Sequence, residues 1–316
     1  MARILETLPD ARIRACSFAN GSARKTWVNA HLPRTGKTWE APDGSPGRII
    51  YIASDQTSPQ LESIQPEDRK RLIIVVPDGM PKETQRVDPA TGEQITVLDM
   101  NWRVEAQRLA QRDWKKEYPD AVAVVWDTKS ETVRKILLQA AKRAEFSEKG
   151  ASQVNPVQPG TEDGVATPQP GDFGMAQMNA VGLADHLIER NPELHVFCIY
   201  HECVATPKRE KGQDDVLFGP AVTGTQGPRL IPQKFGVVLW LSVEQKPPNQ
   251  GDTRVALISQ RDRICGLKAP VGKGVIPETV WLENDVEQAR DFWNRVERVK
   301  TGDVDAFKDT SFKIAK

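Results

Sequence analysis

The sequence predicts an α/β protein with a mostly parallel central sheet, and this prediction depends on the pattern of its apolar segments. Five short apolar runs are separated by polar loops and by segments with helical periodicity, which is typical of parallel strands buried on both faces. The runs occupy residues 12–18, 48–54, 71–76, 121–126 and 194–200. Extended segments follow near 235–243 and 253–259. We therefore expect helices on both faces of a parallel sheet and antiparallel strands at one edge.

Helical periodicity and turn residues mark the segments between the strands. The predicted helices cover residues 26–32, 101–117, 131–144, 173–190 and 286–299. The last of them carries its apolar residues on one side, so it is amphipathic. A Pro/Gly turn at 88–93 predicts a hairpin over 85–99. We expect one domain over residues 1–284, followed by the amphipathic helix and a tail over 285–316.

Composition and charge restrict the class of protein. The chain has 316 residues, of which 39% are hydrophobic, enough for a core of ordinary size. Its 43 basic and 43 acidic residues cancel, which argues against a surface that is basic throughout but allows a local basic loop. None of the four cysteines forms a C-x-x-C pair, so we expect buried thiols rather than a zinc site. The absence of a signal peptide and of any apolar run of ~20 residues predicts a soluble cytoplasmic protein without a membrane partner.

A degenerate phosphate-binding loop is the first candidate site. Such a loop needs a strand, a glycine-rich turn, and then Lys followed by Ser or Thr at the start of a helix, because backbone N–H groups and Lys bind phosphate while the hydroxyl binds magnesium. After the strand at 12–18, Lys25 and Thr26 match this pattern, but Ala19 and Arg24 replace the two defining glycines. The residues expected around the phosphates are Asn20, Gly21, Ser22, Ala23, Arg24, Lys25 and Thr26. The alternative interpretation is a polar turn that caps a helix.

A second segment, Gly36-Lys37-Thr38, also resembles part of a phosphate-binding loop. Its local pattern is more complete than the first. However, no clear buried strand precedes it, and Pro42 prevents the helix that should follow. We therefore prefer the site at Lys25 and interpret the second segment as a turn in a surface loop.

Three polar residues at strand ends are candidate partners of the loop. Asp127 directly follows an apolar strand, as does the carboxylate that orients magnesium or its bound water in ATPases. Asp55 follows the second buried strand, where it could orient and deprotonate the attacking water. His201 follows the fifth apolar run, where it could contact the γ-phosphate. Each also has an ordinary structural interpretation, as a helix cap, a turn residue or a structural histidine.

Two arginines follow the extended segment near 253–259. Arg261 and Arg263 stand one residue apart, with Asp262 between them. Because a guanidinium stays charged and matches phosphate oxygens, such a pair can reach an ATP bound on a neighbouring subunit. A surface ion pair with Asp262 is the alternative.

Taken in order, these segments resemble the phage-encoded RecA-like ATPases that act in single-strand annealing and recombination and consist of the RecA core alone. The resemblance rests on residues 19–26, 51–55, 124–128, 199–202 and 261–270. It implies a RecA-like P-loop fold, ATP and Mg²⁺ as cofactors, and a ring or filament with ATP between subunits. The implied roles are phosphate and magnesium binding by Lys25 and Thr26, magnesium orientation by Asp127, water activation by Asp55, phosphate sensing by His201, and action on a neighbouring subunit by Arg261 and Arg263.

The resemblance also indicates where DNA would bind. Two loops of RecA-like proteins bind single-stranded DNA, and by position these are residues 147–172 and 203–217. The first is rich in Pro, Gly, Gln and Ser, which predicts a mobile segment. The second carries Lys208, Arg209 and Lys211 directly after the fifth apolar run.

The function expected from the resemblance is binding and hydrolysis of ATP by a RecA-like protein that acts on single-stranded DNA. Its setting would be recombination, annealing or replication, with other proteins of these processes, in the cytoplasm of a bacterial host. The family's loop glycines and its Glu are replaced here by Ala19, Arg24 and Asp55. This leaves a second hypothesis open, an adaptor that does not hydrolyse ATP and acts through protein contacts, with the helix at 286–299 as one candidate surface.

Overall fold

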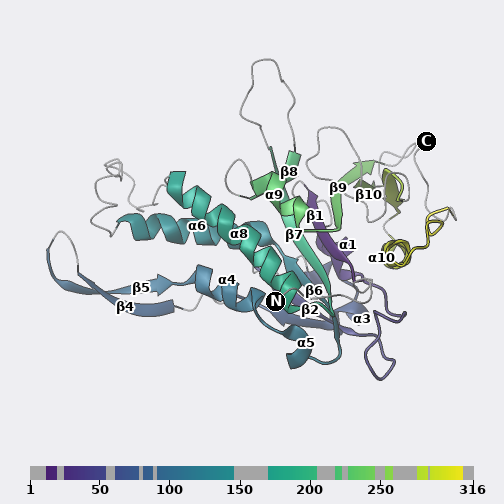
Figure 1. Ribbon diagram of the computed structural model, residues 1–316, viewed down its shortest axis with the longest axis horizontal. Coiled ribbons are helices and arrows are strands. Elements are labelled where there is room, and N and C mark those ends of the chain that lie inside the picture. Colours follow the sequence, from purple (N-terminus) through teal and green to yellow (C-terminus); the bar gives the residue numbers. More distant parts are fainter. Residues whose placement is uncertain are drawn as a thin grey trace, which may run out of the picture.

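A computed structural model shows that the described part of the chain forms a nine-stranded sheet and a separate two-stranded hairpin (Figure 1). The described residues are 12–19, 25–54, 61–77, 81–87, 91–145, 170–204, 218–222, 227–245, 253–258, 276–283 and 285–308. The centre of the sheet consists of parallel strands. In spatial order these are β9 (Val237–Gln245), β1 (Arg14–Ala19), β7 (His195–Val204), β6 (Ala121–Asp127), β2 (Arg48–Ala53) and β3 (Leu72–Val75). The prediction of an α/β protein with a mostly parallel sheet is confirmed.

Antiparallel strands extend the sheet at one edge, as expected. β10 (Thr253–Ile258) pairs with β9, and β11 (Thr279–Leu282) pairs with β10. The short β8 (Phe218–Pro220) pairs with the end of β7. The predicted hairpin is formed by β4 (Pro81–Val87) and β5 (Gln94–Met100), and it extends away from the sheet (Figure 1).

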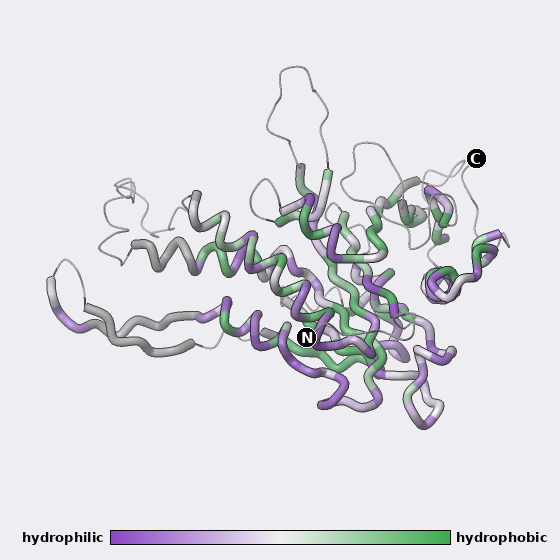
Figure 2. Tube along the Cα trace, in the orientation of Figure 1, coloured by the Kyte–Doolittle hydropathy of each residue, from purple (hydrophilic) through white to green (hydrophobic). Residues whose placement is uncertain are grey.

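Helices cover both faces of the sheet. On one face, α1 (Lys25–Ala30) and α10 (Val286–Lys300) share a core with the strands. The opposite face is covered by α4 (Trp102–Ala110), α6 (Lys129–Glu145), α8 (Pro170–Arg190) and α9 (Gly227–Gln233). Figure 2 shows that hydrophobic residues concentrate along the central strands between these layers. None of the helices in the described part of the chain is both long and apolar enough to span a membrane.

The single helix predicted at 101–117 is interrupted in the structure. α4 ends at Ala110, and α5 (Trp114–Glu117) begins after a break. The side chain of Asn191 occupies the break, because its Oδ1 accepts from Trp114 N at 3.0 Å and its Nδ2 donates to Arg112 O at 3.1 Å. A tertiary contact from a residue distant in sequence therefore overrides the helical pattern.

Other element boundaries also differ from the predictions. α1 begins one residue earlier than expected, at Lys25, and ends at Ala30. β7 continues to Val204, into the segment predicted as a charged loop, and α8 begins at Pro170, within the other predicted loop. The rest of that loop lies outside the described residues. Among the described elements, four were not predicted, namely α3 (Pro66–Arg69), α9, β8 and β11.

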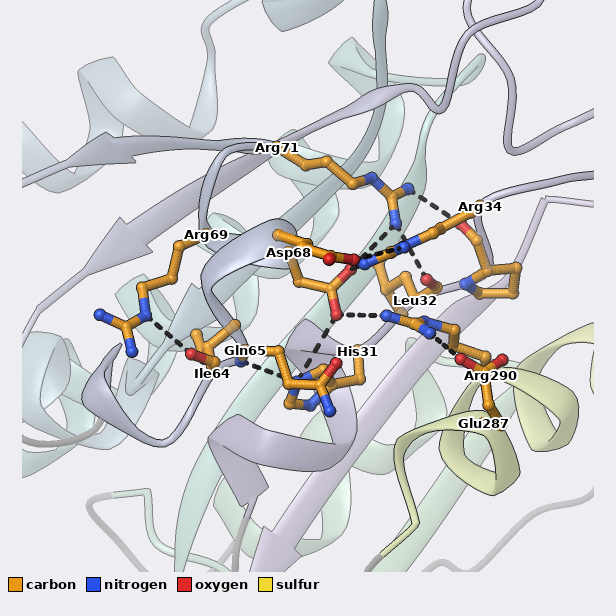
Figure 3. A network of polar contacts seen from close by, with 12 residues as sticks. His31, Leu32, Arg34, Ile64, Gln65, Asp68, Arg69, Arg71, Glu287 and Arg290 are labelled. Carbon is orange, nitrogen blue, oxygen red and sulfur yellow. Dashed lines mark hydrogen bonds and ion pairs between the residues drawn. The ribbon is translucent and has the colours of Figure 1, made fainter.

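The C-terminal helix α10 is part of the core. Its apolar side is buried against the sheet, and Trp293 Nε1 donates to Val28 O at 3.0 Å. A buried carboxylate, Asp68, provides a second link, since it accepts from Arg290 on α10 at 2.5 Å and from Arg34 at 3.1 and 3.2 Å (Figure 3). The apolar side of α10 is therefore covered by the chain itself.

Candidate functional site

The described candidate residues lie at the edge of the sheet where the parallel strands end. β1, β7 and β6 are neighbours in this order, and Ala19 at the end of β1 is in register with His201. Asp127 is the last residue of β6. The helix after β1 lies on one face of the sheet, whereas the helix after β6 lies on the opposite face. In open parallel sheets this divergence leaves a crevice outside the carboxyl ends of the strands, which is where ligands bind.

Lys25 contacts the end of β1 and His201. Its Nζ donates to Ala19 O at 3.1 Å and lies 3.1 Å from Nδ1 of His201. An ammonium group can only donate, so in this contact Nδ1 accepts and the ring carries its proton on Nε2. Nε2 lies 3.5 Å from Thr128 Oγ1. Lys25 is only 5% exposed, so the contact is screened little by solvent.

Thr26 and Asp127 form the second contact between predicted residues. Thr26 Oγ1 donates to Oδ2 of Asp127, and Tyr51 OH donates to the same oxygen at 2.5 Å. Asp127 is 1% exposed. Because a buried carboxylate loses its hydration, the two hydroxyl donors replace part of what water would supply.

A hydrogen-bonded asparagine determines how α1 sits on β1. Asn29 Nδ2 donates to Lys25 O at 2.8 Å, and Ser17 Oγ on β1 donates to Asn29 Oδ1 at 3.2 Å. All six residues of α1 are buried. The first two residues of the helix are therefore held at a defined position beside the end of the strand.

The first turn of α6 holds His201. The backbone N–H of His201 donates to Ser130 Oγ at 3.0 Å, and Ser130 Oγ donates to Ala221 O at 2.7 Å. A pocket of about 310 Å³ adjoins these residues, a volume at the lower end of the range for small-molecule sites. It is lined by Ser130, Glu131, Val133, Arg134, His201, Cys203, Ala221 and Val222.

The rival segment Gly36-Lys37-Thr38 lies near the amino ends of the parallel strands, opposite to the end at which Lys25 lies. Thr38 Oγ1 donates to Glu297 on α10, and it accepts from His195, the first residue of β7, at 2.9 Å. Burial lowers the pKa of His195 well below its ordinary value, so the ring is neutral and donates through Nε2. The hydroxyl of Thr38 thus belongs to a buried network at the amino ends of the strands, which fits a structural turn.

The remaining predicted site residues lie outside the described residues. They are Asn20, Gly21, Ser22, Ala23, Arg24, Asp55, Lys208, Arg209, Lys211, Arg261 and Arg263. The four described candidates, Lys25, Thr26, Asp127 and His201, come together at one edge as two contacting pairs.

Tyr51 and Asn29 are site residues that the sequence patterns did not indicate. Tyr51 falls within an apolar run and Asn29 within a short helix, so neither belongs to a recognisable motif. One signal was available for Tyr51. Most buried phenols have a hydrogen-bond partner, and in a strand that is buried on both faces this partner comes from a neighbouring element.

Lys129 is a third unpredicted feature, two residues after Asp127. It is 0% exposed, and its Nζ has no hydrogen-bond partner among the described residues. Nζ lies 5.0 Å from the centre of the Trp126 ring. Burial lowers the pKa of Lys129, because the charged amine loses its hydration. Burial also raises the pKa values of the nearby thiols of Cys16 and Cys198, since their charged form is the thiolate.

The oxygen donors at this edge fit magnesium. No group of three or more His, Cys, Asp and Glu side chains is arranged to hold a metal ion in the part of the chain that the structure describes. Mg²⁺ does not need such a group, because it keeps several waters and takes one or two protein oxygens together with phosphate oxygens. Thr26 and Asp127 supply hard oxygen donors in contact with each other. A hydroxyl that donates its proton to a carboxylate presents lone pairs, rather than the proton, to a cation.

Comparison with known proteins does not assign the chain to a family. No protein-family model matches it, and no curated protein matches it. A functional proposal therefore depends on the geometry of the carboxyl edge.

Proposed function

We propose that the protein binds ATP with Mg²⁺ at the carboxyl edge of β1, β7 and β6. The observation that carries the proposal is the meeting of Lys25 with His201, and of Thr26 with Asp127, from distant parts of the sequence. A lysine, a hydroxyl and a carboxylate at the ends of parallel strands are the side chains that a phosphate-binding loop and its metal require. In this proposal Lys25 binds the outer phosphates, Thr26 binds magnesium, and Asp127 orients the metal or its bound water.

Binding of a triphosphate would rearrange the contact between Lys25 and His201. In the structure, Lys25 donates to two uncharged acceptors, the Ala19 carbonyl oxygen and the imidazole nitrogen of His201. Phosphate oxygens are anionic and therefore stronger acceptors. We expect Lys25 to exchange His201 for phosphate, after which His201 can contact the terminal phosphate. Because His201 lies on β7, this exchange would link the nucleotide to the segment that follows Val204.

We also propose that the α/β fold is a RecA-like core. The strand before the candidate loop, β1, and the strand that ends in Asp127, β6, are separated by β7. His201 lies on this intervening strand, and its position supports the proposed role as a phosphate sensor between Lys25 and Asp127. The order of the five segments that resemble RecA-like ATPases supports the same proposal.

We further propose that the protein hydrolyses ATP and acts on single-stranded DNA as a ring or filament. Its role would then be in recombination, annealing or replication. These activities need Asp55, Arg261 and Arg263, together with the basic residues at 203–217. If those basic residues bind DNA through its phosphates, we expect binding to weaken strongly between low and moderate salt. Affinity that does not change across this range would contradict phosphate contacts.

Binding of a fluorescent ATP analogue in the presence of Mg²⁺ tests the nucleotide site. Lys25→Ala should weaken binding by about 10- to 100-fold, as expected for the loss of a charge-assisted contact of about 1.5–3 kcal/mol. Lys37→Ala is the matched control, because Lys37 is an exposed lysine in the rival segment. It should bind the analogue as the wild type does.

Each outcome of this experiment decides between alternatives. Loss of binding in Lys37→Ala alone would move the phosphate site to the rival segment. Absence of binding in the wild type would refute the ATP site and favour the adaptor hypothesis. If ATP binds, turnover measured with and without single-stranded DNA separates a hydrolysing enzyme from an adaptor that only binds the nucleotide.

A further inference from the structure

We propose that Tyr51 is a positioning residue for magnesium, and that it acts through Asp127 on the metal-binding hydroxyl of Thr26. This inference rests on the proposed nucleotide site. The inference is based on two hydrogen bonds to one carboxylate oxygen: Tyr51 OH and Thr26 Oγ1 both donate to Oδ2 of Asp127. The three side chains form a relay from β2 through β6 to α1.

The register of β2 and β6 explains why Tyr51 reaches Asp127. Tyr51 pairs with Val125, and Ala53 pairs with Asp127. Residues two apart on a strand point to the same face, so Tyr51 and Asp127 are diagonal neighbours on the face that α1 covers. A diagonal separation is within reach of an aromatic side chain. The phenol can therefore meet the carboxylate from a position two residues before the end of its strand.

The packing of the Tyr51 ring fixes the direction of the hydrogen bond. Tyr51 is 1% exposed and belongs to the core between the sheet and α1. A ring held in this way presents its hydroxyl at one position, so rotation of the Asp127 carboxylate would break a buried hydrogen bond. The proton of Thr26 consequently has a fixed acceptor.

The relay affects magnesium more than the nucleotide. A hydroxyl that binds a metal must direct its proton away from the cation, and in this structure the acceptor for that proton is Asp127. Partners that orient metal ligands commonly contribute 10- to 100-fold to metal affinity or activity. Lys25, which binds phosphate in the proposal, belongs to the other contacting pair.

Removal of the phenol oxygen by Tyr51→Phe tests the relay with little change in packing. We expect the Mg²⁺ concentration that half-saturates binding of the fluorescent ATP analogue to rise by about 10-fold or more. Binding of the same analogue with Mg²⁺ removed by chelation should not change. The matched control is Tyr200→Phe, because Tyr200 is also buried and its hydroxyl has no hydrogen-bond partner among the described residues. This control should have the Mg²⁺ dependence of the wild type.

A double-mutant cycle tests whether Tyr51 acts through Asp127. In an Asp127→Asn background, Tyr51→Phe should cause no further change in the Mg²⁺ dependence, since the relay is already broken. An equal additional loss in that background would overturn the proposal. Asp127→Asn by itself should also raise the half-saturating Mg²⁺ concentration, because it replaces the acceptor of the Thr26 and Tyr51 protons.

The outcomes distinguish this inference from the proposed function. If the wild type binds the analogue and Tyr51→Phe has an unchanged Mg²⁺ dependence, the relay is refuted and the nucleotide site stands. Equal weakening with and without Mg²⁺ also refutes it, because the phenol would then support the site as a whole. If the wild type does not bind the analogue at all, the nucleotide site is refuted and the relay with it.

Discussion

Replacement of Lys129 by Met is expected to stabilise the folded protein. Lys129 is fully buried at the start of α6, and its amine has no hydrogen-bond partner among the described residues. Burial without a partner costs about 1–3 kcal/mol for a polar group, and more for a charged one. The amine gains about 0.5–2 kcal/mol from its position over the Trp126 ring. Met keeps the apolar stem and removes both contributions, so we expect a net stabilisation of about 1 kcal/mol.

The pH dependence of this effect has a defined sign. Burial lowers the pKa of Lys129 in the folded state, whereas the unfolded state keeps an ordinary value of about 10.4. Between these two values the unfolded state binds more protons, so the wild type gains stability as pH rises, by at most about 1.4 kcal/mol per pH unit. The advantage of Lys129→Met should therefore shrink toward pH 10. The difference in the free energy of unfolding between the wild type and the variant removes the contributions that both share, such as that of the Tyr200 hydroxyl, whose pKa is raised by burial.

Urea unfolding of the wild type and the variant at several pH values measures this difference. Lys135→Met is a matched control on the same helix, because Lys135 Nζ donates to Ser54 O at 2.6 Å and its loss should destabilise the protein. A loss of more than about 1 kcal/mol in Lys129→Met would show that the buried amine has a stabilising partner. An advantage that grows with pH would refute the assigned direction of the pKa shift.

Two further predictions concern the polar contacts that hold the helices. Asp68→Asn should destabilise the protein by about 3–5 kcal/mol, because it removes the buried carboxylate that Arg34, Arg71 and Arg290 share. The exposed carboxylates of Glu67 and Glu287, which also contact Arg34 and Arg290, replace only part of it. A loss below about 1 kcal/mol in denaturant unfolding would mean that the remaining contacts with Glu67 and Glu287 compensate the arginines. Asn191→Ala should cost about 1–3 kcal/mol, because Trp114 N loses its buried acceptor. Unchanged stability would show that the break before α5 does not depend on this side chain.

The sequence indicated candidate site residues best where a polar side chain directly follows an apolar run or begins a predicted helix. Lys25, Thr26, Asp127 and His201 could be predicted because each of them follows an apolar run or opens a helix. Such positions can be identified without knowledge of which strands are neighbours. Tyr51 could not be predicted in this way, because its importance arises only from a contact across β2 and β6.

The rival phosphate loop shows the limit of a short motif. Gly36-Lys37-Thr38 matches the local pattern better than the segment at Lys25. In the structure the hydroxyl of Thr38 contacts Glu297, which comes from the last helix of the chain. The motif could not reveal this partner, because the two residues are far apart in sequence.

By itself, the sequence determined the α/β class, the parallel strands and most helices, because the periodicity of apolar residues reflects which faces are buried. Only the tertiary structure decided that β7 lies between β1 and β6, that Asn191 interrupts the predicted helix at 101–117, and that the Lys129 amine is buried. These features depend on which surfaces pack together. Packing between segments distant in sequence leaves no periodic signal in either of them, so the contacts around Asp127 follow from the fold and not from a motif.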